Sequence, residues 1–128
     1  MKTSCLIVED AAFLREVYRI SLKNENVEIV GEAIDGMDAM IKLNQLKPEL
    51  VLLDLVLPLK NGIDILKEIG RISPGSKCIV ISSIDDQDVI DKAMALGALR
   101  YLTKPFTKVQ LLDAIQLVTK KYGEVVNG

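Results

Sequence analysis

The sequence predicts an α/β fold: a single doubly wound sheet of five parallel strands, with five helices covering its two faces. Short apolar runs alternate along the chain with longer segments of helical periodicity, as in proteins built from strand–helix–strand units. Only 4% of the residues are aromatic, so the core must consist mainly of Ile, Leu, Val and Ala. Such a composition suits helices packed on a buried parallel sheet.

The first strand and the first helix are expected at Cys5–Val8 and Ala12–Lys23. The strand is a short apolar run that ends at Glu9 and Asp10. The helix is indicated by apolar residues at helical spacing along one broad face. The residues expected on that face are Phe13, Leu14, Val17, Tyr18 and Leu22.

A second strand is expected at Val27–Val30, where apolar and polar residues alternate before the turn signal Asp35-Gly36. Gly36–Leu46 has helical spacing and ends before Pro48, because proline cannot continue a helix. Leu50–Leu53 is a continuous apolar run, the pattern of a strand buried on both faces.

The second half of the chain repeats this alternation. A helix is expected at Ile63–Ile72 because the breaker Ser73-Pro74-Gly75 follows it. A strand at Cys78–Ile81 precedes a helix at Asp86–Leu96, with Gly97 as its C-terminal stop. The remaining expected segments are a strand at Leu99–Thr103, an amphipathic helix at Lys108–Lys121 and a frayed end at Gly123–Gly128. Residues 1–128 are thus predicted to form one domain.

Composition argues against several classes of function. The formal net charge is −2 and no segment gathers Lys and Arg, so direct binding of nucleic acid is not expected. No apolar stretch is long enough for membrane insertion and no signal peptide is recognisable, so a cytoplasmic location is expected. Cys5 and Cys78 begin apolar runs and are expected to be buried, reduced thiols. The chain contains no histidine, which excludes Ser-His and Cys-His catalysis.

Polar side chains gather at the carboxyl ends of the predicted strands, where open parallel sheets form their sites. Glu9 and Asp10 follow the first strand, and Asp54 follows the third. The fourth and fifth strands end at Ser82-Ser83 and Lys104. Each of these residues alone fits a turn, a helix cap or a solvated side chain. Their complementary chemistry at one rim of the sheet favours a functional site.

Carboxylates, hydroxyls and an amine together suit phosphoryl chemistry. Neighbouring carboxylates repel one another unless a cation is present, and Mg²⁺ takes a few carboxylates while keeping several waters. A lysine can hold one phosphoryl oxygen and a hydroxyl can donate to another. One carboxylate can itself be the nucleophile, which gives an aspartyl phosphate.

In combination, these residues resemble the response-regulator receiver domains of two-component systems, the CheY-like family. The resemblance extends from about Leu6 to Leu117. The motifs that carry it are Val8-Glu9-Asp10 with the following Ala-Ala-Phe-Leu-Arg, Gly31-Glu-Ala with Asp35-Gly36, Asp54 with Pro58 and Gly62, Gly97-Ala98, and Tyr101-Leu-Thr-Lys104-Pro105-Phe106. The resemblance implies a flavodoxin-like sheet with strand order 2-1-3-4-5.

The resemblance also implies roles for the rim residues. Asp54 would be the phosphoacceptor, and its partner a sensor histidine kinase, since the chain has no histidine of its own. Mg²⁺ would be bound by Asp10 directly and by Glu9 mainly through water, with Asp54 and the backbone carbonyl of Val56 as further ligands. Lys104 would pair with the phosphoryl group and precede a cis bond to Pro105. The protein would assist its own phosphorylation and dephosphorylation without being an enzyme that turns over a separate metabolite.

A conformational switch is implied as well. Ser82, where threonine is more usual, would be the switch hydroxyl, and Tyr101 the aromatic ring that follows it inward. Ser83 stands where alanine or glycine is more usual. The output partner would bind a face formed by the fourth helix, fifth strand and fifth helix. The residues expected on it are Gln87, Asp88, Asp91, Ala95, Tyr101, Lys108 and Leu111.

Two aliphatic residues stand at positions that flank the phosphate in this family. Val56 and Ile84 would hinder, or fail to orient, the hydrolytic water. We therefore expect slower autodephosphorylation than with polar residues at these positions.

Other functions remain open from the sequence. The chain could be a receiver cut from a longer transcription factor or enzyme, or an interaction module that works without phosphate. The stretch Asp10–Arg15 looks chemotaxis-like, which favours a stand-alone regulator. An aspartyl-phosphate phosphatase is disfavoured, because such enzymes normally have a further acid where Val56 stands. A flavin carrier is disfavoured by the few aromatic residues and by the absence of a phosphate-cradling loop after the first strand.

Overall fold

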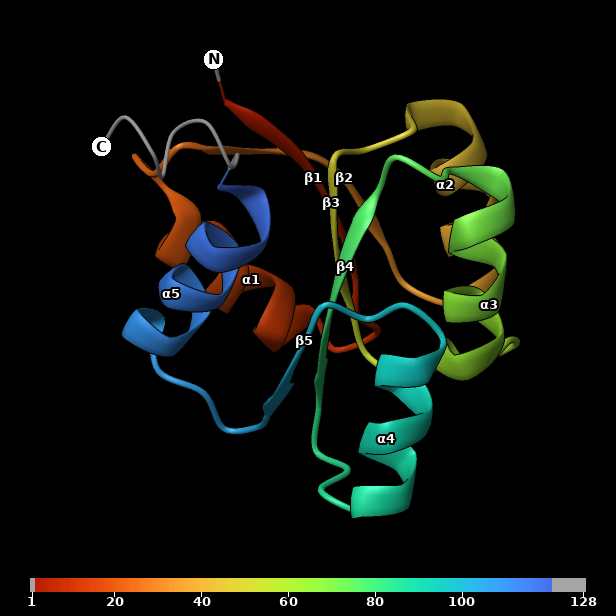
Figure 1. Ribbon diagram of the computed structural model, residues 1–128. Helices are drawn as coiled ribbons and strands as arrows, with labels where there is room; N and C mark the ends of the chain where they lie inside the picture. The colour runs from red at the N-terminus through yellow and green to blue at the C-terminus, as the bar shows by residue number, and fades with distance from the viewer. Residues whose placement is uncertain (1, 121–128) are drawn as a thin grey trace.

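A five-stranded parallel sheet lies between two layers of helices (Figure 1). The computed structural model describes residues 2–120. The strands are β1 (Thr3–Val8), β2 (Val27–Ala33), β3 (Leu50–Leu53), β4 (Lys77–Ser82) and β5 (Arg100–Thr103). They are arranged in the order β2-β1-β3-β4-β5, which confirms the fold class and the strand order expected from the sequence.

Helices alternate with these strands and cover both faces of the sheet. They are α1 (Ala12–Leu22), α2 (Gly36–Leu46), α3 (Gly62–Ile72), α4 (Gln87–Ala95) and α5 (Lys108–Thr119). Figure 1 shows α1 and α5 on one face, with α2, α3 and α4 on the other. The expected helix end at Lys121 and the expected frayed end lie outside the described residues. No helix within residues 2–120 has the length and apolar character needed to cross a membrane.

The sheet divides the core into two halves. Leu6, Val51 and Leu53 pack on the side of α2 and α3, against residues such as Leu43 and Ile65. Their neighbours along the strands face the other way. The buried residues on the side of α1 and α5 include Cys5, Ile7, Leu50, Leu52, Tyr18 and Leu111. This alternation leaves all of β3 buried, as the continuous apolar run predicted.

Several element bounds differ by one or two residues from the sequence-based expectation, and two further differences have a structural reason. The second strand continues to Ala33, because Glu32 and Ala33 pair in parallel with Ile7 and Val8 of β1. Phe13 was expected on the buried face of α1, yet it is 76% exposed. It lies in the first turn of that helix, where it lines a surface hollow beside Lys104-Pro105-Phe106 rather than the sheet core.

Glycines allow two helices to begin close to the end of β3. A Cβ atom on Gly62 would lie 2.5 Å from the carbonyl oxygen of Asp54, so the start of α3 can approach Asp54 only without a side chain. Gly36 starts α2, and its amide donates a 3.0 Å hydrogen bond to the carbonyl oxygen of Pro58. Both contacts hold the loop that follows Asp54.

Candidate functional site

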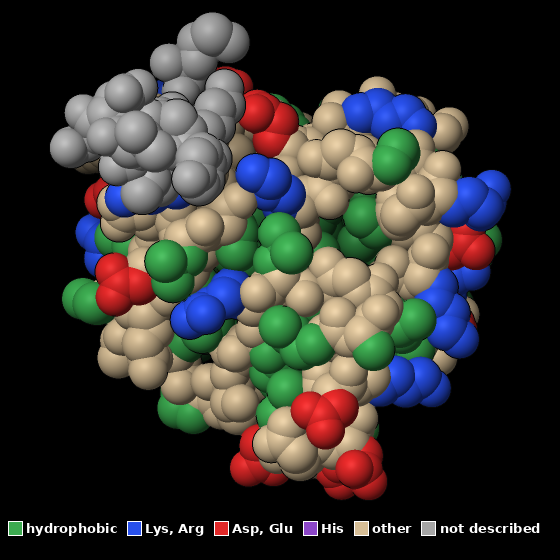
Figure 2. Space-filling view, in the orientation of Figure 1, with side chains coloured by type: hydrophobic (Ala, Val, Ile, Leu, Met, Phe, Trp, Pro, Cys, Tyr) green, Lys and Arg blue, Asp and Glu red, His purple; other side chains and the backbone are tan. Residues whose placement is uncertain are grey.

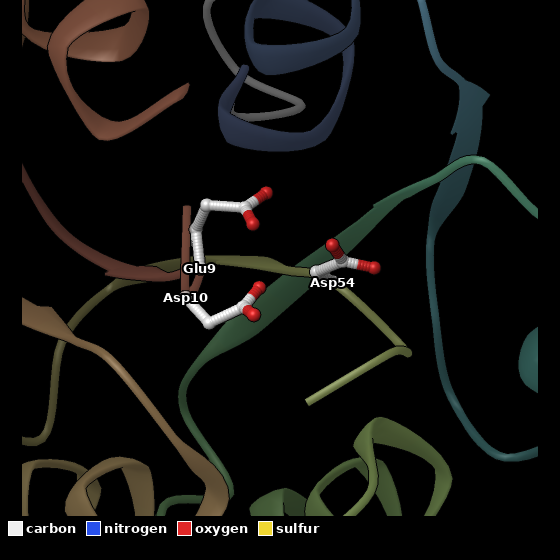
Figure 3. A group of neighbouring side chains, drawn as sticks. All are labelled: Glu9, Asp10 and Asp54. Atoms are coloured by element: carbon white, nitrogen blue, oxygen red, sulfur yellow. The ribbon is translucent and has the colours of Figure 1, made fainter. Parts of the chain in front are cut away.

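Three carboxylates come together at the carboxyl ends of β1 and β3 (Figure 3). Glu9, Asp10 and Asp54 each offer one oxygen, and these oxygens lie within 4.8 Å of one another. Backbone hydrogen bonds continue the sheet past the strand ends and position two of the residues. The Asp54 amide donates to the Val8 carbonyl over 3.0 Å, and the Glu9 amide to the Ala33 carbonyl over 2.9 Å.

Lys104 lies between two of the carboxylates. Its Nζ donates to Glu9 Oε1 over 2.6 Å and to Asp54 Oδ2 over 2.7 Å. The other Asp54 oxygen, Oδ1, accepts from the Val56 amide over 3.0 Å. The peptide bond between Lys104 and Pro105 is cis, as expected. The sequence reasoning thus placed Lys104 correctly at the rim that carries the acids.

The three acids differ in how far they are buried. Glu9 is 2% exposed and Asp54 is 6% exposed, whereas Asp10 is open to solvent. Burial raises the pKa of Glu9, and the charge of Asp54 raises it further, although hydrogen bonds from Lys104 and the Ala11 amide act in the opposite direction. Burial by itself would lower the pKa of Lys104, but its hydrogen bonds to Asp54 and Glu9 outweigh that effect and raise it.

The donor set fits a small divalent cation. With the acids ionised, three carboxylates and one ammonium leave two uncompensated negative charges at this rim. Carboxylate oxygens are hard ligands of the kind that Mg²⁺ prefers. Among residues 2–120, no group donates a hydrogen bond to the Asp10 carboxylate, so its oxygens are available to a cation. The three acids therefore form a pocket that could bind a metal ion.

Ser82 and Tyr101 lie beside the loop between β4 and α4. Ser82 is fully buried, and its Oγ accepts from the Ile84 amide over 3.4 Å. The Tyr101 hydroxyl donates to the Ile84 carbonyl oxygen over 2.6 Å. Burial raises the pKa of Tyr101, and nearby acids, Asp54 among them, add to that rise. Among the described residues, neither hydroxyl forms a hydrogen bond with the acidic pocket.

All but one of the residues expected on the output face are at least partly exposed. Gln87, Asp88, Asp91 and Ala95 of α4 are exposed, Lys108 of α5 is exposed, and Tyr101 of β5 is half-buried. Leu111 was placed on this face wrongly, because it is 0% exposed. It belongs to the stripe of α5 that packs on the sheet, at helical spacing with Ala114, Ile115 and Val118.

Arg15 is a site residue that the sequence reasoning missed. In the sequence, Arg15 stands out only as the last residue of the motif Asp10–Arg15. Its Nη1 lies 3.0 Å from the carbonyl oxygens of both Glu9 and Asp10. The available signal was its spacing, since a residue in the second turn of a helix can reach back over the loop that precedes that helix.

Comparisons with known proteins agree with this geometry. The sequence model of the response regulator receiver domain matches residues 5–116. The chemotaxis protein CheY of Thermotoga maritima is 38% identical over 115 residues, which cover 90% of this chain and 96% of that protein. The transcriptional regulatory protein PdtaR of Mycobacterium tuberculosis is 38% identical over 122 residues, 94% of this chain and 58% of the longer relative.

Solved structures share the same architecture. In a complex from Borrelia burgdorferi that contains CheX, CheY, BeF₃ and Mg²⁺, the matching chain has a TM-score of 0.89 and 26% sequence identity. The match covers 93% of this chain and 90% of that one. The response regulator domain of Thermotoga maritima CheB gives a TM-score of 0.84 at 28% identity, with 92% and 96% covered. Fold, acidic rim and sequence thus agree that this chain belongs to the CheY-like receiver domain family and is a two-component response regulator.

Proposed function

We propose that this receiver accepts a phosphoryl group on Asp54 in a reaction that requires Mg²⁺, and that phosphorylation changes which partner it binds. The observation that carries the proposal is the juxtaposition of three carboxylates with Lys104. Asp54 is the acid that Lys104 contacts at the end of the central strand β3. The membership of this chain in the receiver domain family also supports Asp54 as the phosphoacceptor.

The proposed transfer is a simple displacement at phosphorus. A carboxylate oxygen of Asp54 forms a bond to phosphorus as the bond from phosphorus to the histidine nitrogen of the donor breaks. The electron pair of that bond returns to the imidazole nitrogen, which is then free to take a proton. Lys104 balances negative charge on the phosphoryl oxygens from its position 2.7 Å from Asp54 Oδ2.

Glu9, Asp10 and Asp54 would hold the metal ion, and the Val56 carbonyl stays a predicted fourth ligand. When bound, Mg²⁺ would supply charge neutralisation to the phosphoryl oxygens. Hydrogen bonds from Lys104 and the Ala11 amide favour the ionised form of the buried Glu9, against the effect of burial. This chain's own contribution is therefore to hold acids and ammonium in place before the donor arrives.

A sensor histidine kinase is the proposed donor. These 128 residues contain no histidine, so a phosphohistidine has to come from outside them. We place this exchange in the cytoplasm, a reducing compartment that suits the two buried free thiols. The chain would act as a signalling phosphoacceptor and would turn over no separate metabolite.

The proposed output face lies at α4, β5 and the start of α5. Figure 2 shows acidic side chains gathered where α4 begins, and Asp85, Asp86, Asp88 and Asp91 are exposed there. Tyr101 joins β5 to the loop before α4 through its bond to Ile84, so a rearrangement of that loop would reach this face. Similarity to CheY proteins supports a chemotaxis-type output, and similarity to PdtaR supports a receiver joined to an output domain.

The experiment is intact-protein mass spectrometry after incubation with acetyl phosphate or phosphoramidate. Wild type and Asp54→Asn are compared with and without Mg²⁺. We expect one labile phosphoryl adduct on the wild type that needs Mg²⁺ and is absent from the variant.

Glu49→Gln is a matched control, because Glu49 is an exposed acid that bonds Ser4 and takes no part in the acidic pocket. It should be labelled like the wild type. An adduct that persists in Asp54→Asn would place the phosphate elsewhere. Absence of any adduct, together with undetectable Mg²⁺ binding, would indicate an interaction module that works without phosphate.

A further inference from the structure

Arg15 connects three segments of the chain behind the acidic pocket. It belongs to α1, and its side chain is 17% exposed. Its Nη1 donates to the carbonyl oxygens of Glu9 and Asp10, at 3.0 Å in each case. Its Nε lies 3.3 Å from Oε1 of Glu32 on β2. The guanidinium therefore joins α1, the loop after β1 and the neighbouring strand.

These two carbonyl groups belong to the peptide planes on either side of the Asp10 Cα atom. A peptide unit is rigid, so fixing the direction of its carbonyl oxygen also fixes the direction of its N–H group. One guanidinium thus restrains both soft dihedral angles at Asp10. The direction in which the Asp10 side chain leaves the backbone follows from those angles.

The second of these planes is held at both of its ends. Its carbonyl oxygen, that of Asp10, accepts from Arg15. Its N–H group, that of Ala11, donates to Glu9 Oε2 over 3.2 Å. The same peptide unit therefore couples Arg15 to the carboxylate of Glu9, whose other oxygen accepts from Lys104. A change at Arg15 would therefore reach two of the three acids through the backbone groups that it contacts.

We propose that Arg15 is a positioning residue that sets the directions of the Asp10 and Glu9 carboxylates and, through them, the affinity of the pocket for Mg²⁺. The part that concerns Mg²⁺ rests on the proposed function, whereas the restraint of the loop does not. Residues that orient metal ligands without touching the metal typically change affinity by about 10- to 100-fold when mutated.

Electrostatics alone predicts the opposite sign. Arg15 is a positive charge close to the proposed cation site, and removal of a like charge should strengthen cation binding. If Arg15 positions the acids, its neutralisation should weaken binding instead. The direction of the change in affinity therefore separates the two roles.

Arg19 provides a matched control on the same helix. It lies one turn further along α1 and also pairs with Glu32, and it has a second partner in Glu16 at 2.7 Å. Within residues 2–120 it makes no hydrogen bond to the loop that carries Glu9 and Asp10. Arg15→Gln and Arg19→Gln remove the same charge and one partner of Glu32, but only the first releases the two peptide planes.

The first measurement is the amide hydrogen-exchange rate of the metal-free protein, monitored by NMR. The amide of Ala11 should exchange about tenfold or more faster in Arg15→Gln, since its peptide unit loses one of its two restraints. Arg19→Gln should leave this amide unchanged within about twofold. Arg15→Lys keeps the charge but lacks the planar fork, so it should restore protection only in part. Unchanged exchange at Ala11 in Arg15→Gln would overturn the proposal.

The second measurement is calorimetric titration of the same variants with MgCl₂. We expect Arg15→Gln to bind Mg²⁺ about 10- to 100-fold more weakly than the wild type, and Arg19→Gln to bind within about twofold. Tighter binding by Arg15→Gln, or an equal loss in both variants, would refute the positioning role. If the wild type binds no Mg²⁺, the proposed function fails, and the Ala11 exchange rates still decide whether Arg15 restrains the loop.

Discussion

Glu9 is an acid whose burial favours its neutral form. The ordinary pKa of this group is 4.5, and burial raises it, so the folded state holds the proton to higher pH than the unfolded state does. The resulting stabilisation is fully present below pH 4.5 and is lost as the pH rises through the raised pKa. Above the raised pKa, an ionised Glu9 therefore costs stability in the metal-free fold.

Glu9→Gln should consequently stabilise the metal-free protein at neutral pH, by about 1.4 kcal/mol for each unit of pKa shift that it removes. Urea unfolding in EDTA at a series of pH values from acid to neutral will show whether the advantage of the variant grows with pH. Glu16→Gln is the control, because Glu16 is an exposed acid of α1. A difference between wild type and Glu9→Gln that does not change with pH would contradict this explanation.

Val56 and Ile84 concern the lifetime of the proposed phosphate. Val56 is 55% exposed beside Asp54, to which its amide donates, and Ile84 lies in the loop after Ser82. Neither side chain can orient a water molecule by hydrogen bonding. The double variant Val56→Asn, Ile84→Glu should lose its phosphate faster, by about tenfold, which equals about 1.4 kcal/mol in the barrier.

The protein is first phosphorylated in the presence of Mg²⁺. The decay is then measured by loss of the mass adduct after exchange into Mg²⁺-containing buffer without the phosphodonor. Val109→Asn is a control for added polarity, because Val109 is exposed on α5. Decay that is unchanged or slower in the double variant would show that these side chains do not control hydrolysis.

At the scale of elements, the start of α3 is fixed by its contact with the end of β3. Gly62→Ala would place a Cβ atom 2.4 Å from the Leu55 Cα and 2.5 Å from the Asp54 carbonyl oxygen, and both of these are backbone atoms. Because backbone cannot yield as a flexible side chain can, we expect a loss of about 1–3 kcal/mol in unfolding free energy. The displacement should also reduce phosphorylation of Asp54.

Gly70→Ala supplies the comparison within the same helix. No atom lies within 4 Å of the position that its Cβ would occupy, so α3 should gain up to about 1 kcal/mol from the better helix former. Urea denaturation of both variants tests the pair. Equal changes in unfolding free energy for Gly62→Ala and Gly70→Ala would show that the close backbone contact at Gly62 does not cause the loss of stability.

Across the whole molecule, the sheet separates two cores that share its strands. Cys5 lies in the core beneath α1 and α5, and Cys78 in the core beneath α2, α3 and α4. Burial raises the pKa of each thiol to about 12, so neither should react while the protein is folded.

The two thiols therefore report whether the halves of the core open together. We expect the single-cysteine variants Cys5→Ala and Cys78→Ala to be labelled by a thiol reagent with the same opening free energy, because one sheet carries both faces. Labelling rates at increasing urea concentration give that energy for each remaining thiol. A thiol that opens at a much lower energy than the other would show that one helical layer separates by itself.

The sequence by itself determined the order of the strands and helices, and it determined which residues lie at the carboxyl ends of the strands. The unbroken apolar run Leu50–Leu53 predicted a central strand, and Asp54 follows the carboxyl end of that strand. Parallel strands then bring their carboxyl ends to one rim, which is why Glu9, Asp10 and Lys104 were predictable neighbours. These features depend on the spacing of apolar residues and on the order of strands and helices, and both can be read from the sequence.

Tertiary structure alone decided which side of an element a borderline residue occupies and which groups meet across it. The family resemblance placed Leu111 on the output face, but packing against the sheet buries it. Phe13 fitted the apolar stripe of α1, yet the first turn lies outside the core. The contacts of Arg15 with the Glu9 and Asp10 carbonyls depend on the angle between α1 and the loop after β1. No periodicity encodes that angle, because it results from how the helix packs on the sheet.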